Sequence, residues 1–292
     1  MPSGIIIKGV GGFYYVESDE GVFECKARGI FRKDGIIPLP GDRICFTVID
    51  KDKKVGNIDR IMPRFSQLVR PSVANVEQVI VVISVKSPSA DFMLLDKLLA
   101  TAEYKELAAV ICINKIDLDP DNEHKKIIDI YTSAKYKVIA TSIKYGIGLD
   151  SLKEALCGKI SVLAGQSGVG KSTIINGIMN AGMMKTGELS AKIERGKHTT
   201  RHVELIKLCE GGYILDTPGF SSFDVLEIQA EDLQYCYPEF RDYLNTCRFA
   251  HCSHISEPGC GVKEALNKGY INTDRYNRYI QLYDYLKQQK KY

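Results

Sequence analysis

One stretch of eight residues constrains the fold of this chain more than any other. Residues 165–172 read Gly-Gln-Ser-Gly-Val-Gly-Lys-Ser and fit the P-loop pattern, in which four residues separate a glycine from Gly-Lys-Ser. Residues 159–164 before it are mostly apolar and predict a short buried strand, and residues 172–183 after it predict a helix. A glycine-rich turn without a ligand is the alternative, but the combined pattern indicates a phosphate site.

The chemistry expected of this loop follows from its backbone and two side chains. Its N–H groups can point inward at phosphate oxygens, and the following helix adds the positive end of its dipole. Lys171 is expected to reach the outer phosphates, and the Ser172 hydroxyl is expected to ligate Mg²⁺. The predicted nucleotide-binding residues of the loop are Gly165, Gln166, Ser167, Gly168, Val169, Gly170, Lys171, Ser172 and Thr173.

The bulk composition is that of an ordinary globular chain. Its 292 residues are 45% hydrophobic and 26% charged, which suffices for two or three compact units. The nine cysteines are odd in number and mostly scattered, which indicates reduced thiols rather than a disulfide framework. The apolar runs are too short to span a membrane and no signal-peptide layout is visible, so we expect a cytoplasmic protein. The net charge of +3 is too weak to indicate nucleic-acid binding by itself.

Residues 1–62 are predicted to form a small closed barrel. Five short strand-like runs, each separated by turn residues, lie within these residues, and the OB fold is the leading candidate. OB barrels often bind nucleic acid, and Arg28, Arg32 and Lys33 surround an aromatic residue, Phe31. RNA contact and a plain solvated loop are both open interpretations of that cluster.

From residue 78 onward the pattern changes to alternating strands and helices. Residues 78–85 form a near-continuous apolar run, which is typical of a parallel sheet covered on both faces. Helical spacing follows at 92–107 and 123–134, with strands predicted at 108–113 and 137–140. These elements predict a doubly wound α/β domain with its ligand sites at the carboxyl ends of the strands.

At the end of the strand 108–113 stands the motif Asn114, Lys115, Ile116, Asp117. The Asp117 carboxylate accepts hydrogen bonds only, so it can take both N–H donors of the guanine edge, which adenine lacks. Thr141 and Ser142 follow the next strand, where a second loop would touch the base. We therefore expect GTP to be preferred over ATP, although a polar turn after a strand is the alternative interpretation.

Residues 185–202 are polar, lack a period, and predict a mobile loop after the P-loop helix. Such loops carry a threonine that closes on Mg²⁺, and either Thr199 or Thr200 is a candidate, with Thr200 preferred. A hairpin follows and ends at Asp216-Thr-Pro-Gly219. Asp216 is expected to hold Mg²⁺ through water, and the Gly219 N–H is expected to bond the γ-phosphate.

A metal site is predicted near the C-terminus, where Cys247, Cys252, His254 and Cys260 form a Cys-x4-Cys-x-His-x5-Cys pattern. Three thiolates and one imidazole make a closed, structural Zn²⁺ site, and His251 is an alternative to His254. Reduced cysteines in a loop are the plainer interpretation. Residues 270–292 carry aromatic and apolar residues at helical spacing, which favours a packed face over a surface for RNA.

The order of the motifs is unusual, because Asn-Lys-x-Asp precedes the P-loop by about fifty residues. Rotating the chain to begin at residue 159 restores the familiar order, which indicates a circular permutation. With Gly196-Lys-His-Thr-Thr200 and Asp216-Thr-Pro-Gly-Phe220, the chain resembles the circularly permuted GTPases of small-ribosomal-subunit assembly, the RsgA (YjeQ/YloQ) type.

This resemblance implies an OB barrel at 1–66, a permuted GTPase domain at 67–225 and a small zinc-binding, mainly helical domain at 226–292. It favours His254 as the zinc ligand. It also implies a protein that binds the small ribosomal subunit and its rRNA during late maturation of that subunit. We expect this protein to be monomeric and not to associate with a membrane. GTP hydrolysis to GDP and phosphate is then expected to be slow until the subunit stimulates it.

The water-activating residue must replace the glutamine that Ras-type GTPases place after the Asp-x-x-Gly loop, since Phe220 stands there. His198 is the candidate, with Lys171 as the second catalytic residue and His202 as a weaker alternative. A loop histidine that only contacts RNA is the plainer interpretation. Two rival functions are a GTP-gated RNA-binding scaffold with negligible turnover and a P-loop nucleotide kinase, against which the Asn114–Asp117 motif argues.

Overall fold

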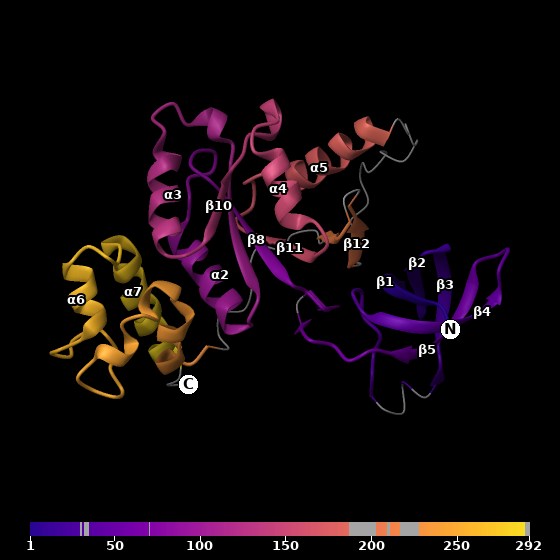
Figure 1. The fold of residues 1–292 in the computed structure, drawn as a ribbon, viewed down its shortest axis with the longest axis horizontal. Helices are drawn as coiled ribbons and strands as arrows, with labels where there is room; N and C mark the ends of the chain where they lie inside the picture. Colours follow the sequence, from indigo (N-terminus) through magenta and orange to yellow (C-terminus); the bar gives the residue numbers. More distant parts are fainter. Residues whose placement is uncertain are drawn as a thin grey trace. The chain divides into compact units, whose positions relative to one another are not determined.

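The computed structural model describes residues 1–29, 31, 35–69, 71–186, 203–208, 211–216 and 228–289 (Figure 1). These residues fall into two compact units, and each is described by itself. Within the described ranges, every helix is either too short or too polar to cross a membrane.

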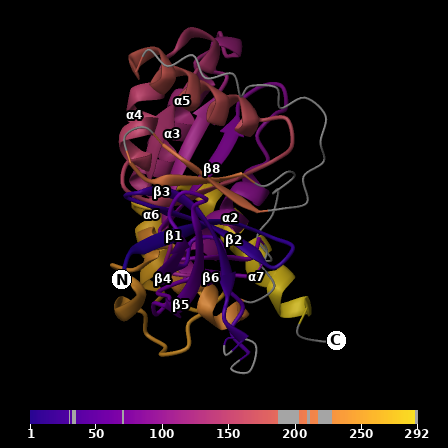
Figure 2. The same ribbon diagram turned by 90° about the vertical axis from the view of Figure 1, so that its right-hand side faces the viewer.

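The first unit begins with a closed five-stranded barrel, which confirms the predicted OB-like fold (Figures 1 and 2). Strand β1 pairs antiparallel with β2 and β4, β2 pairs antiparallel with β3, and the parallel pair β3–β5 and the antiparallel pair β5–β4 complete the closure. The strands are β1 (Ser3–Val10), β2 (Phe13–Ser18), β3 (Gly21–Ala27), β4 (Arg43–Asp50) and β5 (Val55–Ile61).

Alternate side chains of these strands fill the barrel, as period-2 strands require. Phe23 and Phe46 pack with their ring centroids 5.2 Å apart. The buried core of the barrel consists of Ile6, Val16, Phe23, Cys25, Phe31, Ile44, Phe46 and Ile58. Because a barrel of this size is filled by its own side chains, its interior leaves ligand contacts to the outer surface and the loops.

The connector after the barrel is fixed to it by a buried carboxylate. Arg64 donates to both oxygens of Asp42, at 2.7 and 2.8 Å, and Asp42 is fully buried. Strands β6 (Gln67–Leu68) and β7 (Val73–Ala74) form a short hairpin, and Asn75 donates to the carbonyl of Gly41. The connector is therefore a packed segment rather than a free linker.

The first unit also contains residues 160–162 of β11 (Ile160–Ala164) and the whole of β12 (Glu204–Lys207) and β13 (Tyr213–Asp216). Strand β13 pairs parallel with β11 and antiparallel with β12, as the predicted hairpin requires. Strand β1 of the barrel pairs with β12, with Lys8 opposite Glu204, and Glu17 accepts hydrogen bonds from Lys207 and Tyr213. The barrel wall and the hairpin thus form one continuous ladder.

The second unit contains the parallel strands β8 (Gln78–Ser84), β9 (Ala108–Asn114) and β10 (Lys137–Ala140), ordered β10–β9–β8. Every residue of β8 is buried, which confirms the prediction from its apolar run. The helical segments that lie in this unit are α2 (Phe92–Tyr104), η1 (Ile116–Leu118), α3 (Glu123–Ser133), η2 (Ile143–Tyr145) and the N-terminal parts of α4 (Leu149–Leu156) and α5 (Lys171–Thr186), up to residues 154 and 177.

The C-terminal part of the second unit is helical with its own small core. Its elements are η4 (Ala230–Cys236), η5 (Pro238–Phe240), η6 (Leu244–Thr246), α6 (Gly261–Asn267) and α7 (Thr273–Gln289). Tyr276, Tyr279 and Leu286 of α7 are buried in this core, which confirms the prediction of a packed face.

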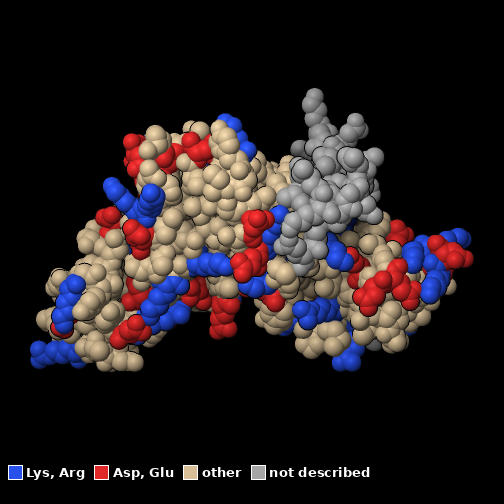
Figure 3. All heavy atoms as spheres, turned by 45° about the horizontal axis from the view of Figure 1, so that its top comes forward, with Lys and Arg blue, Asp and Glu red and all other residues tan. Residues whose placement is uncertain are grey.

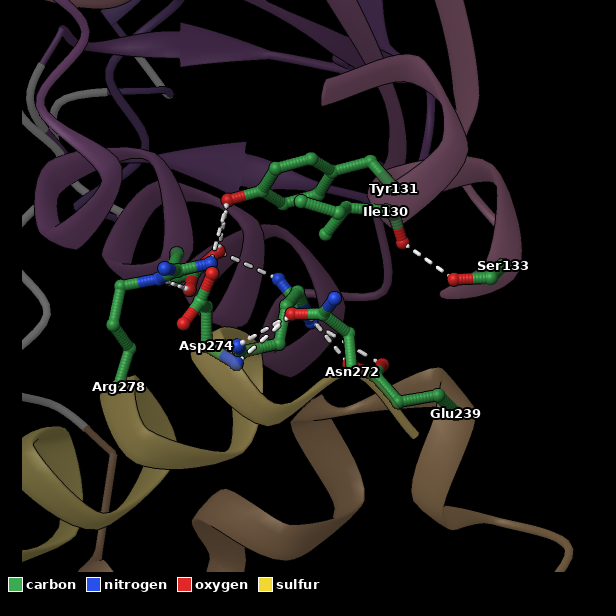
Figure 4. Close-up of polar contacts among 9 residues, drawn as sticks. Ile130, Tyr131, Ser133, Glu239, Asn272, Asp274 and Arg278 are labelled. Atoms are coloured by element: carbon green, nitrogen blue, oxygen red, sulfur yellow. Dashed lines mark hydrogen bonds and ion pairs between the residues drawn. The ribbon is translucent and has the colours of Figure 1, made fainter. Parts of the chain in front are cut away.

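A buried ion-pair network joins this C-terminal part to α2 and α3 (Figure 4). The Arg275 guanidinium is 1% exposed and donates to Glu239 Oε1 and to Asp96 Oδ1, both at 2.6 Å. Asp96 is also buried and accepts from Arg278 and from the Tyr131 hydroxyl. The guanidinium of Arg275 further lies over the rings of Tyr131, Tyr136 and Tyr237.

Removing one carboxylate from this network is expected to destabilise the protein strongly. Asp96→Ala leaves the buried guanidinium of Arg275 and the half-buried one of Arg278 with fewer partners, which costs about 3–5 kcal/mol in the free energy of unfolding. Asp242→Ala is the matched control, because it removes the exposed ion pair with Lys135 that joins the same two parts. Its cost is expected to stay below about 1 kcal/mol. Denaturant unfolding followed by circular dichroism measures both, and equal losses would contradict the assignment.

Candidate functional site

The P-loop turns sharply at the end of β11 because only glycine fits its first position. Gly165 has φ of +136°, and a Cβ at this position would overlap the carbonyl oxygen of Val82 in β8. L-residues with side chains are strained in such a backbone conformation. The loop is therefore pressed against the sheet at its first residue.

Lys171 and Ser172, the two side chains predicted to bind phosphate and Mg²⁺, lie in the first turn of α5. Lys171 Nζ donates to the carbonyls of Gly165 and Gln166 at 2.5 and 2.9 Å, so the lysine curls over its own loop. Burial lowers the pKa of Lys171. Ser172 and Thr173 are exposed at the helix N-terminus, where an anion and its counter-cation would meet.

The Asn-Lys-x-Asp motif lies directly against the P-loop, although the two are about fifty residues apart in the sequence. Asn114 Nδ2 donates to the carbonyl of Val169 at 2.9 Å, and Lys115 Nζ donates to that of Gly168 at 2.7 Å. A Cβ at Gly170 would lie 2.5 Å from Asn114 Nδ2. The two predicted halves of a nucleotide site thus form one site.

Thr141 and Ser142, which directly follow β10, orient the side chains of this motif. The buried Thr141 hydroxyl donates to Asn114 Oδ1 at 3.1 Å, and the buried Ser142 hydroxyl donates to Asp117 Oδ1 at 2.6 Å. The backbone of Ile116 bonds to that of Thr141. Asp117 itself is exposed, so its carboxylate is held on one side and remains accessible on the other.

Several predicted site residues fall outside the described part of the chain. They are His198, Thr199, Thr200, His202 and Gly219. Asp216 is the last residue of β13, one position after the pairing of Leu215 with Val162 of β11. Its backbone therefore lies at the carboxyl end of a strand, as predicted.

The predicted metal cluster assembles around four ligand atoms that all lie within 4.8 Å of one another. Cys247 Sγ and Cys260 Sγ are 3.9 Å apart, and His254 Nδ1 is 3.5 and 3.4 Å from these two sulfurs. A tetrahedral zinc requires about 3.8 Å between sulfurs and about 3.5 Å between sulfur and nitrogen. The fourth member is Cys252, so the donor set and its spacing fit Zn²⁺.

The cluster includes His254, whereas the alternative His251 is exposed outside it. Burial lowers the pKa of His254, which favours the neutral imidazole that ligates metals. Its other ring nitrogen, Nε2, lies 2.8 Å from Gln234 Oε1, and its backbone carbonyl accepts from Tyr276. Gln234 thereby fixes the ring so that Nδ1 faces the sulfurs.

Glu257 shapes the loop between the ligands and was not found by the sequence analysis. Its Oε1 accepts from the Ser253 N–H at 2.8 Å and from the Ser253 hydroxyl at 2.6 Å. Its Oε2 accepts from the N–H groups of Ile255 and Ser256. Burial alone would raise the pKa of Glu257, but these hydrogen bonds lower it to about 2. A carboxylate three residues after the predicted ligand His254 carries no spacing signal from which this role could be predicted.

The structure bears on the possible RNA contact around Phe31 in the barrel. Phe31 is only 7% exposed and belongs to the barrel core, so its ring is not available for stacking on a base. Arg28 is paired with Asp59, while Arg32 and Lys33 lie outside the described residues. On the face drawn in Figure 3, basic and acidic side chains are interspersed.

Two family models match the chain. The RsgA GTPase model matches residues 61–226, and the RsgA N-terminal domain model matches residues 3–58. The matched regions cover the barrel, the connector and the strands and loops of the nucleotide site. The order of motifs in this chain is therefore the order of that family.

Curated relatives that match almost the whole of this chain lead to the same family. The small ribosomal subunit biogenesis GTPase RsgA of Ruminiclostridium cellulolyticum is 58% identical over 289 residues, covering 98% of this chain and 94% of its own. The protein of the same name from Agathobacter rectalis is 48% identical, with 99% and 100% coverage.

Two solved structures share the fold. YjeQ from Thermotoga maritima has a TM-score of 0.85 at 38% identity, covering 98% of both chains. YloQ, described as a circularly permuted GTPase, has a TM-score of 0.82 at 35% identity, covering 99% of this chain and 96% of its own. The barrel, the permuted nucleotide site and the cysteine–histidine cluster are thus found together in a chain that belongs to the RsgA family of circularly permuted GTPases.

Proposed function

We propose that this protein is a cytoplasmic, monomeric GTPase that binds the small ribosomal subunit and its rRNA and acts in late maturation of that subunit. The names of its relatives supply the ribosomal partner. The observation that carries the nucleotide part is the contact of Asn114 and Lys115 with the P-loop carbonyls. The proposed domains are the barrel at 1–66, the GTPase domain at 67–225 and the zinc domain at 226–292.

In the proposed site, the guanine edge donates two hydrogen bonds to Asp117, which Ser142 orients. The phosphates lie in the loop 165–170, and Lys171 exchanges its loop carbonyls for phosphate oxygens. Ser172, Thr200 and Asp216 are the residues that would hold Mg²⁺, which neutralises charge on the phosphates when bound. The ammonium group of Lys171 can bond to a phosphate oxygen in the same way as it bonds to a loop carbonyl. The proposed exchange therefore needs little movement of the lysine.

Hydrolysis requires an oriented water, and His198 is the residue proposed to orient it or accept its proton. The support is its position beside Thr199 and Thr200 in the sequence and the apolar Phe220 after the Asp-x-x-Gly motif. Gly219 is proposed to bond the γ-phosphate. A GTP-gated RNA-binding scaffold with negligible turnover remains the alternative, and turnover in the presence of small subunits separates the two.

A base-reading role for Asp117 predicts a change of nucleotide preference. In Asp117→Asn one carboxylate oxygen becomes an amide donor, so GTP affinity should fall and xanthosine triphosphate should bind better. Asp129→Asn, an exposed carboxylate on α3, is the matched control and should leave both affinities unchanged. Fluorescence titration measures them, and an unaltered GTP affinity in Asp117→Asn would rule out the role.

A phosphate-binding role for the P-loop predicts a loss of turnover. Lys171→Ala and Ser172→Ala should each lower the GTP hydrolysis rate at least about a hundredfold, or about 3 kcal/mol of barrier. Lys125→Ala, an exposed lysine on α3, is the control. Phosphate release is measured with and without purified small subunits. Wild-type rates in both P-loop variants would place the active site elsewhere, and a wild-type protein that subunits fail to stimulate would favour the scaffold.

Metal analysis is expected to find one zinc per chain, held by Cys247, Cys252, His254 and Cys260. Cys252→Ser and Cys260→Ser should each lose it, because a serine hydroxyl is a poor zinc ligand. Cys45→Ser, a thiol of the barrel, should keep full occupancy. Chelation should also lower the melting temperature, since the metal stabilises a segment with a small core. Full zinc content in both cluster variants would exclude these ligands.

A further inference from the structure

The loop between β8 and α2 is joined to the P-loop by the Lys115 bridge and by Pro88. Lys115 Nζ donates to the carbonyl of Ser87 at 2.6 Å and to that of Gly168 at 2.7 Å, so it bridges the two loops. Pro88 lies next to Gly168, within 3.6 Å of the position a Cβ would take there. The Ser84 hydroxyl donates to the Pro88 carbonyl at 2.8 Å, which fixes the loop to the end of β8.

The same loop leads directly into the part of α2 that the C-terminal segment holds. Asp91 caps the helix by accepting from the N–H of Leu94. The guanidinium of Arg278 lies 5.4 Å from the ring centroid of Phe92, the first helical residue, and also donates to Asp96 one turn later. Residues 87–96 therefore connect the P-loop with α7 through direct contacts.

The contacts at the α7 end cannot be exchanged for water at low cost. Asp96 is 1% exposed and receives Arg275, Arg278 and the Tyr131 hydroxyl. A buried carboxylate that loses its partners is strongly disfavoured, so α2 and α7 stay docked or separate as a whole. An all-or-none contact of this kind has two states, docked and separated. Binding at either of two sites can shift the equilibrium between them.

We infer that Arg275 and Arg278 are positioning residues that couple guanine-nucleotide binding at the P-loop to docking of the C-terminal domain on α2. This inference rests on the proposed nucleotide site. A nucleotide that packs on the Lys115 stem and fills the loop at Gly168 restrains Ser87, and thereby the start of α2. By linkage, the docked α7 raises nucleotide affinity by the same factor by which nucleotide favours docking.

The test compares Arg278→Leu with Lys135→Ala, which removes an exposed ion pair between the same two parts. Nucleotide affinity is measured with fluorescent GDP and a non-hydrolysable GTP analogue, after circular dichroism has verified folding. Arg278→Leu is expected to weaken binding at least about fivefold, the lower end of typical coupling, and Lys135→Ala is expected to change nothing. Should Arg278→Leu fail to fold, Arg278→Lys is used, with weaker binding of at least about twofold expected.

Hydrogen exchange supplies the readout that a merely structural role would not alter. In the wild type, saturating nucleotide is expected to protect the amides of α7, and Lys115→Met at saturation should lose that extra protection. Unchanged affinity in the Arg278 variant, or α7 protection that is independent of nucleotide, would overturn the coupling. A wild-type protein that binds no guanine nucleotide would instead overturn the proposed function, so the two failures are distinguishable.

Discussion

The close approach of two backbone loops is the constraint on which the rest of this structure depends. Gly165 lies against the Val82 carbonyl, and Gly170 lies against the Asn114 amide, so neither position admits a side chain. Each loop follows a buried strand, and parallel strands place such loops at one edge of a sheet. The glycines, the buried strands and the paired motifs therefore serve one requirement, which is to hold polar loops close enough for direct hydrogen bonds.

The C-terminal domain is stabilised in a different way, because its core is small. The cysteine–histidine cluster fixes its loops from within, with Glu257 and Gln234 orienting the ligands. The Arg275 network fixes the domain to α2 and α3 from outside. Buried ion pairs add little net stability compared with apolar packing, but a guanidinium fork accepts few geometries. The network therefore defines the orientation of the domain more than its strength of attachment.

The parts of the fold and of the site that depend on the local spacing of residues could be predicted from the sequence. The P-loop, Asn114–Asp117, the barrel strands and the four cluster ligands all have short, regular patterns. The Arg275–Asp96 pair spans 179 residues and has no period, so only the fold reveals it. Phe31 shows the limit of such patterns, since its basic neighbours in the sequence left RNA contact open while the ring fills the barrel. The bridge from Lys115 to Ser87 likewise could not be predicted, because it depends on a loop that carries no motif.

The distance along the chain between Asp96 and its partners has a consequence for synthesis. Helix α2 emerges from the ribosome long before α7, which begins at Thr273. Until α7 appears, the Asp96 carboxylate and the Tyr131 hydroxyl have to stay in water, because burying them unpaired is costly. The sheet can form early, domain by domain. The face of α2 that receives α7 becomes dry only after residues 273–289 have been made, so a chain terminated before them would expose this polar face and remain recognisable as unfinished.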